Sequence, residues 1–234
     1  MNKMEKRNIY FLGIGGIGMS ALARYFYQKG CIVSGYDKTP SPLTKKLEEE
    51  GILVHYEDNP DLIPENVDLV ILTPAIPTDS LELNYFRDIK ANIMKRAEVL
   101  GEISRRCDSV AVAGSHGKTT VTAMITHLLN FAGKKMSAFV GGIAKNINSN
   151  VVIGDENDEI VVMEADEFDR SFLQLTPYIS IVTSIDADHL DIYGDKEQLV
   201  QGFEQFVNKT KSDGVVICNQ SLQLVTTRKK LTYG

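Results

Sequence analysis

The stretch that decides the fold reads Ala113-Gly114-Ser115-His116-Gly117-Lys118-Thr119-Thr120. It follows an apolar run, Ser109 to Ala113, and opens an amphipathic segment, Lys118 to Phe131. A glycine turn between a buried strand and a helix is typical of a phosphate-binding loop, because backbone N–H groups and the helix N-terminus attract anions. The spacing is shorter than G-x-x-x-x-G-K-[ST], whose first glycine would fall at Val112. A chance Gly-Lys-Thr is common in surface turns but not between a strand and a helix, so we predict a nucleotide site.

The residues of this loop have separable chemical roles. Backbone donors would surround the phosphates, the ammonium group of Lys118 would lie by the β and γ oxygens, and the hydroxyl of Thr119 would bind Mg²⁺. The predicted nucleotide-binding residues are Gly114, Ser115, His116, Gly117, Lys118, Thr119 and Thr120.

Acidic residues follow two later strand-like runs. Glu164 opens an acidic run that extends to Arg170, and His189 lies in a similar segment that begins at Asp186. Because strand ends face the crevice where α/β sheets bind ligands, we expect Glu164 to bind Mg²⁺ opposite Thr119, and His189 to serve a metal as well. Carboxylates with a histidine and no cysteine fit magnesium better than zinc. A local ion pair of Asp169 with Arg170 remains an alternative use of the later acids.

A second glycine loop, Gly13-Ile14-Gly15-Gly16-Ile17-Gly18, follows the apolar run Asn8 to Leu12 and opens a helix. The pattern G-x-G-x-x-G lets a backbone approach a pyrophosphate, and Asp37 lies 19 residues beyond Gly18, where an acid can reach ribose hydroxyls. This pattern predicts a phosphate-bearing nucleotide in general. The alternative is that the glycines only permit close packing of helix on strand.

Strand-like and helix-like segments alternate along the whole chain, which predicts an α/β fold. We expect residues 1–106 to form a Rossmann-like domain with a parallel sheet. Residues 107–234 are expected to form a P-loop-type α/β ATPase domain. The stretch Ile143 to Asp158, rich in Asn and Gly, is predicted to be a loop.

Composition excludes several classes of protein. The chain of 234 residues carries 25 Lys+Arg and 31 Asp+Glu, a net charge of −6, which does not suit a nucleic-acid backbone. No apolar run approaches the roughly 20 residues of a membrane span. Cys31, Cys107 and Cys218 are too widely spaced to suggest a disulfide framework or zinc site. We expect a cytoplasmic protein, with no signal for an oligomeric state.

Taken together, four motifs resemble the Mur ligases of peptidoglycan synthesis. They are Phe11-Leu12-Gly13-Ile14-Gly15-Gly16-Ile17-Gly18-Met19-Ser20, Ala113-Gly114-Ser115-His116-Gly117-Lys118-Thr119-Thr120, Glu164-Ala165-Asp166-Glu167 and Asp188-His189-Leu190-Asp191-Ile192-Tyr193. They occur in the family's order over essentially the whole chain. The first is similar to the branch that adds L-alanine, and distinguishes it from the tripeptide-recycling branch, which remains an alternative. The family's Ser-Ser-Ala-Ile loop is Thr73-Pro74-Ala75-Ile76 here, and its usual Thr before the histidine is Ser115.

This resemblance implies ATP-dependent ligation of L-alanine to the carboxylate of UDP-N-acetylmuramate through an acyl phosphate. Lys118, Glu164 and His189 would be the catalytic residues, with Thr119 and Glu164 on one Mg²⁺ and His189 on a second. The implied residues for the sugar nucleotide are Gly13, Gly15, Gly16, Ile17, Gly18, Asp37, Thr73 and Ala75. The family also has a third, C-terminal domain, so we expect a truncated chain that is inactive by itself.

Two other functions remain to be compared. A nicotinamide-dependent oxidoreductase would use the first glycine loop and Asp37, but it leaves Lys118, Glu164 and His189 without a role. A nucleotide-binding module without catalysis would use both loops.

Overall fold

The computed structural model describes residues 7–144, 149–154, 160–186, 193 and 195–234. The chain divides into two compact units, unit 1 (Met1–Val99) and unit 2 (Leu100–Gly234). Helix α4 (Arg96–Arg106) begins in the first unit and ends in the second. Across the described ranges, no helix is long and apolar enough to cross a membrane.

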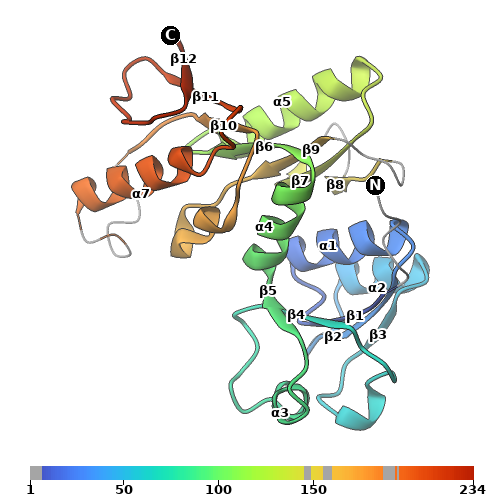
Figure 1. Cartoon of the computed structure of the whole chain (residues 1–234). Coiled ribbons are helices and arrows are strands. Elements are labelled where there is room, and N and C mark those ends of the chain that lie inside the picture. Colours follow the sequence, from blue (N-terminus) through green and yellow to red (C-terminus); the bar gives the residue numbers. More distant parts are fainter. Residues whose placement is uncertain (1–6, 145–148, 155–159, 187–192, 194) are drawn as a thin grey trace. The chain divides into compact units, whose positions relative to one another are not determined.

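Unit 1 is a five-stranded parallel sheet in the order β3-β2-β1-β4-β5 (Figure 1). Its elements are β1 (Asn8–Leu12), α1 (Ile17–Gln28), β2 (Ile32–Tyr36), α2 (Pro42–Glu49), β3 (Leu53–His55), the short 3-10 helix η1 (Pro60–Leu62), β4 (Leu69–Leu72), α3 (Leu81–Asp88) and β5 (Ile93–Lys95). The chain builds outward from β1 on one side and then crosses to β4 on the other. The glycine loop after β1 therefore lies at the switch point where such sheets bind ligands.

The local sequence explains why these elements form. Ile9 to Leu12 are at most 2% exposed, because β1 is the central strand of a parallel sheet. Helix α2 begins at Pro42 with a capping box, in which the side chains of Ser41 and Thr44 each accept a bond from the other's backbone N–H. The predicted Rossmann-like sheet is confirmed.

Unit 2 is a seven-stranded sheet in the order β12-β11-β10-β6-β9-β7-β8. Its further elements are β6 (Asp108–Ala113), α5 (Lys118–Phe131), β7 (Met136–Ala144), β8 (Ser149–Val152), β9 (Ile160–Glu164), the 3-10 helix η2 (Phe168–Gln174), β10 (Ile179–Val182), α7 (Lys196–Asn208), β11 (Val215–Asn219) and β12 (Lys229–Tyr233). Strand β8 pairs antiparallel with β7, and the other pairs are parallel. Helix α5 packs on β6, β7 and β9. The predicted α/β fold is confirmed, and the glycine loop Gly114 to Gly117 lies between a strand and a helix as expected.

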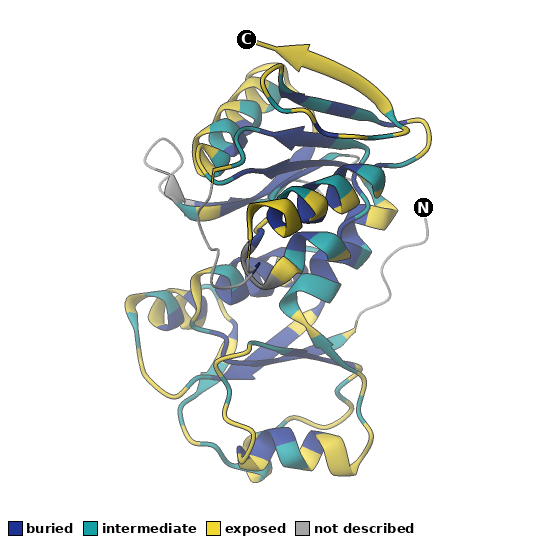
Figure 2. Ribbon diagram, turned by 90° about the vertical axis from the view of Figure 1, so that its left-hand side faces the viewer, coloured by how far each residue is buried: buried dark blue, intermediate teal, exposed yellow. Residues whose placement is uncertain are grey.

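Two edge segments differ from the prediction. The expected loop Ile143 to Asp158 contains the end of β7 and the whole of β8, so that prediction was wrong in part. Strand β7 runs through Gly141 and Gly142, which normally indicate a turn, and β8 is held by pairing rather than by an apolar pattern. Strand β12 was not predicted. All five of its residues are exposed, so buried and exposed side chains do not alternate along it (Figure 2).

A buried polar cluster connects three elements of unit 1. The hydroxyl oxygen of Tyr10 lies 2.6 Å from both Nε2 of His55 and Oε2 of Glu82. Nδ1 of His55 lies 2.9 Å from the carbonyl oxygen of Glu57, which can only accept, so Nδ1 carries a proton. With neutral His55 and ionised Glu82, the single hydroxyl proton of Tyr10 cannot serve both 2.6 Å contacts. One further proton, on Glu82 or on His55, completes the network.

Burial determines where that proton resides. The side chain of Glu82 is fully buried, and burial raises its pKa to about 7. Burial also lowers the pKa of His55. Below about pH 7 these directions favour protonated Glu82 beside neutral His55, with the hydroxyl proton of Tyr10 directed at Nε2; above it, the Tyr10 hydroxyl donates to Oε2 of Glu82.

We expect the Glu82 contribution to stability to decline as pH rises. The pKa of Glu82 is about 7 in the folded chain and 4.5 as a reference, so its stabilisation is complete below 4.5 and is lost through about 7. A shift of that size corresponds to a loss of up to about 3 kcal/mol of unfolding free energy. His55, whose pKa is lowered, acts in the opposite direction and loses stability as pH falls.

Glu82→Gln isolates the carboxyl group, because an amide donates to Tyr10 without titrating. Urea unfolding of both chains between pH 4.5 and 8.5 should show the variant gaining on the wild type as pH rises. A difference that does not change with pH would contradict the assignment.

Candidate functional site

The phosphate loop of unit 2 has the backbone geometry that its glycines predict. Gly114 has φ +137° and Gly117, which precedes α5, has φ +84°. A side chain at Gly114 would also collide with the hydroxyl group of Thr183. Both positions therefore require glycine, and the loop turns sharply from β6 into the N-terminus of α5.

Residues after β10 hold this loop in place. The N–H of Ser115 donates to the carbonyl oxygen of Ser184 (3.1 Å), and the N–H of His116 donates to the Ser184 hydroxyl (3.0 Å). The hydroxyl group of Thr183 donates to the carbonyl oxygen of His116 (2.5 Å). His116 also lies 3.8 Å from a carboxylate oxygen of Asp186. Sequence reasoning examined this segment for metal ligands and missed its contacts with the loop.

The ammonium group of Lys118 points back onto the loop. Nζ donates to the carbonyl oxygen of Gly114 at 2.7 Å, and to Oε1 and Oε2 of Glu167 at 2.9 and 2.8 Å. The side chain of Glu167 is 1% exposed and that of Lys118 is 18% exposed. An ammonium group has three protons, so these contacts can account for all of its donors. The sequence did not identify Glu167 as the partner of Lys118.

The predicted magnesium ligands lie on neighbouring elements. Glu164 ends β9 in register with Val112 of β6, and its Oε1 accepts a bond from the N–H of Gly141 (2.8 Å). Thr119 is the exposed second residue of α5. Magnesium commonly binds through one or two protein oxygens plus substrate phosphates, so this carboxylate and hydroxyl suit it.

The remaining part of the metal prediction is not tested. His189 lies outside the described residues. Within the described part of the chain, no group of three or more His, Cys, Asp or Glu side chains could hold a metal ion.

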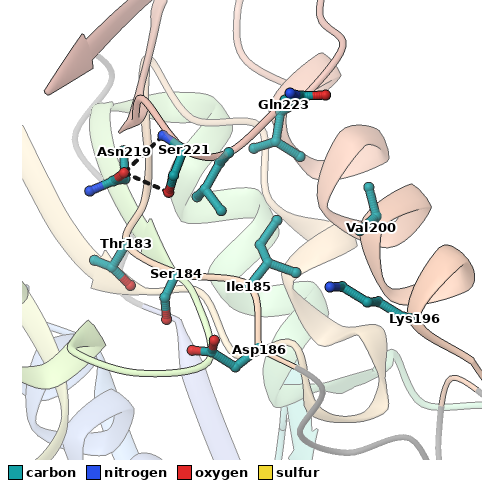
Figure 3. Close-up of a pocket in the computed structure, with 11 residues that line it drawn as sticks. Thr183, Ser184, Ile185, Asp186, Lys196, Val200, Asn219, Ser221 and Gln223 are labelled. Carbon is teal, nitrogen blue, oxygen red and sulfur yellow. Dashed lines mark hydrogen bonds between the residues drawn. The ribbon is translucent and has the colours of Figure 1, made fainter. Parts of the chain in front are cut away.

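A pocket of about 610 Å³ lies at the carboxyl ends of β10 and β11 (Figure 3). It is lined by Thr183, Ser184, Ile185, Asp186, Lys196, Val200, Asn219, Ser221, Leu222, Gln223 and Leu224. Its β10 wall is the segment that contacts the phosphate loop, and α7 contributes Lys196 and Val200 opposite. In the β11 wall, Oδ1 of Asn219 accepts bonds from the N–H and the hydroxyl group of Ser221 (2.9 and 2.7 Å). The pocket therefore borders the loop at the ligand-binding edge of the sheet.

The backbone N–H groups of the glycine loop of unit 1 are bonded to the end of β2. The N–H groups of Gly13 and Ile14 both donate to the carbonyl oxygen of Tyr36 (2.8 and 3.0 Å). The N–H of Gly15 donates to Oδ2 of Asp37 (2.7 Å). Asp37, predicted to reach a ribose, is thus engaged with the loop. Helix α1 then begins at Ile17 with no side-chain cap.

Two further side chains contact this loop. The methyl group of Thr73 packs so closely on Gly13 that a side chain there would collide, whereas Ala75 lies in an exposed turn. The guanidinium group of Arg96 packs in the same way on Gly18. Arg96 was missed because no spacing rule connects the start of α4 to a loop after β1.

Replacing Lys118 by Ala should destabilise unit 2 as well as remove a phosphate ligand. The change leaves the buried carboxylate of Glu167 without its cation, which costs about 3 kcal/mol or more of unfolding free energy. The double variant Lys118→Ala/Glu167→Gln should recover much of that loss, because no buried charge remains. Urea unfolding of the three chains measures this, and an unfolding midpoint of Lys118→Ala equal to the wild type would contradict it.

A largely parallel sheet with a glycine-rich loop of the phosphate-binding type after its central strand defines an α/β protein of the P-loop class. The comparisons with known proteins identify the family. Residues 8–107 match the family described as "Mur ligase family, catalytic domain", and residues 112–233 match "Mur ligase middle domain". The chain belongs to the Mur ligase family.

Similar proteins agree with this assignment. The chain is 50% identical over 238 residues to the UDP-N-acetylmuramate–L-alanine ligase of Flavobacterium psychrophilum, covering 100% of this chain and 52% of that protein. It is 50% identical to the enzyme of the same name from Parabacteroides distasonis, covering 97% and 51%. The chain thus spans about half the length of the curated relatives it matches.

Solved structures have the same fold. A UDP-N-acetylmuramate-alanine ligase from Thermotoga maritima superimposes with a TM-score of 0.80 at 31% identity, covering 97% of this chain and 53% of that one. A UDP-N-acetylmuramate:L-alanyl-gamma-D-glutamyl-meso-diaminopimelate ligase from Neisseria meningitides gives 0.86 at 24% identity, covering 97% and 78%, and shows likeness of fold alone.

Proposed function

We propose that this chain binds ATP at the phosphate loop of unit 2 and UDP-N-acetylmuramate at the glycine loop of unit 1. These are two binding steps of a ligase that joins L-alanine to the muramyl carboxylate. The observation that carries the proposal is the phosphate loop itself, with Lys118 directed back onto it beside the strand that ends in Glu164. The names of relatives about 50% identical to the chain supply the substrates.

The proposed reaction balances without a covalent enzyme intermediate. A carboxylate oxygen of the sugar nucleotide attacks the γ-phosphorus of ATP, giving an acyl phosphate and ADP. The amine of L-alanine then attacks the acyl carbon, inorganic phosphate leaves with the bonding electrons, and the proton that the amine nitrogen loses ends on the released phosphate or in solvent. The protein's contribution is position and charge, since Lys118 lies where it can balance the charge on the transferred group.

The oxygen ligands of Thr119 and Glu164 would hold a magnesium ion carried by the nucleotide. The ion would neutralise phosphate charge, as in other phosphoryl-transfer sites. A role of His189 at a second ion stays a prediction.

In unit 1, the N-terminus of α1 and the guanidinium group of Arg96 suit a diphosphate. Thr73 and Ala75 belong to the turn after β4 and would contact the sugar nucleotide by the family resemblance. The division of the two domains at residues 106 and 107 stays a prediction; α4 ends at Arg106, and the two compact units divide within this helix, between Val99 and Leu100. A cytoplasmic location is likewise proposed, because the three cysteines form no disulfide and so suit a reducing compartment.

Binding measurements on matched variants test the two assignments separately. The double variant Lys118→Ala/Glu167→Gln, which leaves no buried charge unpaired, should bind Mg·ATP roughly 10- to 100-fold more weakly, because a charge-assisted contact is lost. It should bind UDP-N-acetylmuramate like the wild type. Arg96→Ala should show the reverse pattern. Calorimetry with both ligands measures this.

The same titrations distinguish the competing functions. Binding of NADH without the sugar nucleotide would favour an oxidoreductase and overturn the proposal. Loss of both ligands in the double variant, with its fold intact by circular dichroism, would contradict separate sites in the two units.

A further inference from the structure

The contact between Lys118 and Glu167 has a consequence for nucleotide binding, and the inference rests on the proposed ATP site. Gly114 and both carboxylate oxygens of Glu167 can account for the donors of the ammonium group. A phosphate oxygen that approaches Lys118 must therefore displace one of these acceptors. Gly114 is part of the loop, so the acceptor that can be exchanged is the carboxylate.

The backbone of Glu167 is held by its surroundings, whereas Lys118 has a flexible stem. The carbonyl oxygen of Glu167 accepts bonds from the hydroxyl group of Tyr193 (2.7 Å) and from the N–H of Arg170 (3.0 Å). The guanidinium carbon of Arg170 lies 5.1 Å from the centre of the Tyr193 ring. Tyr193 is itself 1% exposed, so Glu167, which directly precedes η2, has a buried backbone partner.

We propose that Glu167 is a positioning residue that holds Lys118 in the nucleotide-free protein and competes with the triphosphate for its ammonium group. The carboxylate keeps the cation inside the loop and neutralises it in an environment where an unpaired charge is costly. A triphosphate presents the same kind of acceptor oxygen to the same donors. Nucleotide binding is then an exchange of one anionic partner for another, and Glu167 sets the affinity.

Removing the negative charge of Glu167 should strengthen the binding of phosphate ligands rather than weaken it. Glu167→Gln keeps the size of the side chain and one acceptor oxygen but removes the competing charge. In the complete chain, the variant should bind Mg·ATP and inorganic tripolyphosphate about tenfold more tightly, a change of about 1.4 kcal/mol. Tighter binding of tripolyphosphate would show that the gain concerns phosphate rather than the nucleoside.

Asp213→Asn is the matched charge control. Asp213 is an exposed residue in the turn before β11, at the end of the sheet opposite the phosphate loop. The substitution removes one negative charge from unit 2 without changing the partners of Lys118. The dissociation constants of this variant for Mg·ATP and tripolyphosphate should therefore equal those of the wild type. An equal gain in Asp213→Asn would mean that only net charge had changed, and would overturn the proposal.

The remaining outcomes separate this inference from the proposed function. A wild type that binds Mg·ATP and loses it in Lys118→Ala/Glu167→Gln, with unchanged or weaker binding in Glu167→Gln, would overturn the role of Glu167 and leave the ATP site standing. Weaker binding with a lowered melting temperature would identify a purely structural residue. Absence of Mg·ATP binding in every chain would overturn both.

Discussion

The placement of β6 in the middle of the unit 2 sheet is the constraint on which the rest of that unit depends. Strand β6 is bonded to β9 on one side and β10 on the other, so its carboxyl end cannot shift without breaking both ladders. The chain must then reverse direction within the four residues between β6 and α5. The neighbouring strands deliver Glu164 on one side and Ser184 on the other to the place where that turn occurs. A rigid sheet thus positions a loop whose own sequence is short and polar.

The two units treat buried carboxyl groups in different ways. The carboxyl group of Glu167 is paired with the ammonium group of Lys118. Glu82 faces Tyr10 and His55, has no lysine or arginine partner among its described contacts, and instead has a pKa raised by burial to about 7. Both arrangements avoid an unpaired buried charge, but they leave different properties behind. The first makes a site sensitive to anions, and the second makes a core sensitive to pH.

The sequence predicted the parts that depend on neighbours along the chain. Both glycine loops could be predicted because glycine adopts without strain the positive φ found at Gly13, Gly114 and Gly117, a preference set by the residue itself. The acidic residues that begin at Glu164 were found because ligand-binding side chains are known to lie at the carboxyl end of a parallel strand. Glu167, Thr183 and Arg96 could not be ranked in the same way, since their partners lie far away in sequence and only the packed sheet brings them together. Strands β8 and β12 were missed because backbone pairing at an edge needs no apolar pattern.

Strand β12 has a consequence for how this chain behaves in concentrated solution. It is the last strand in its sheet, it pairs with β11 alone among the described strands, and its residues are exposed. Such an edge offers a row of unbonded backbone donors and acceptors to any extended peptide. Lys229 and Lys230 place two positive charges at its start, which oppose the approach of a second identical edge. The two lysines therefore act against association of two molecules through this edge.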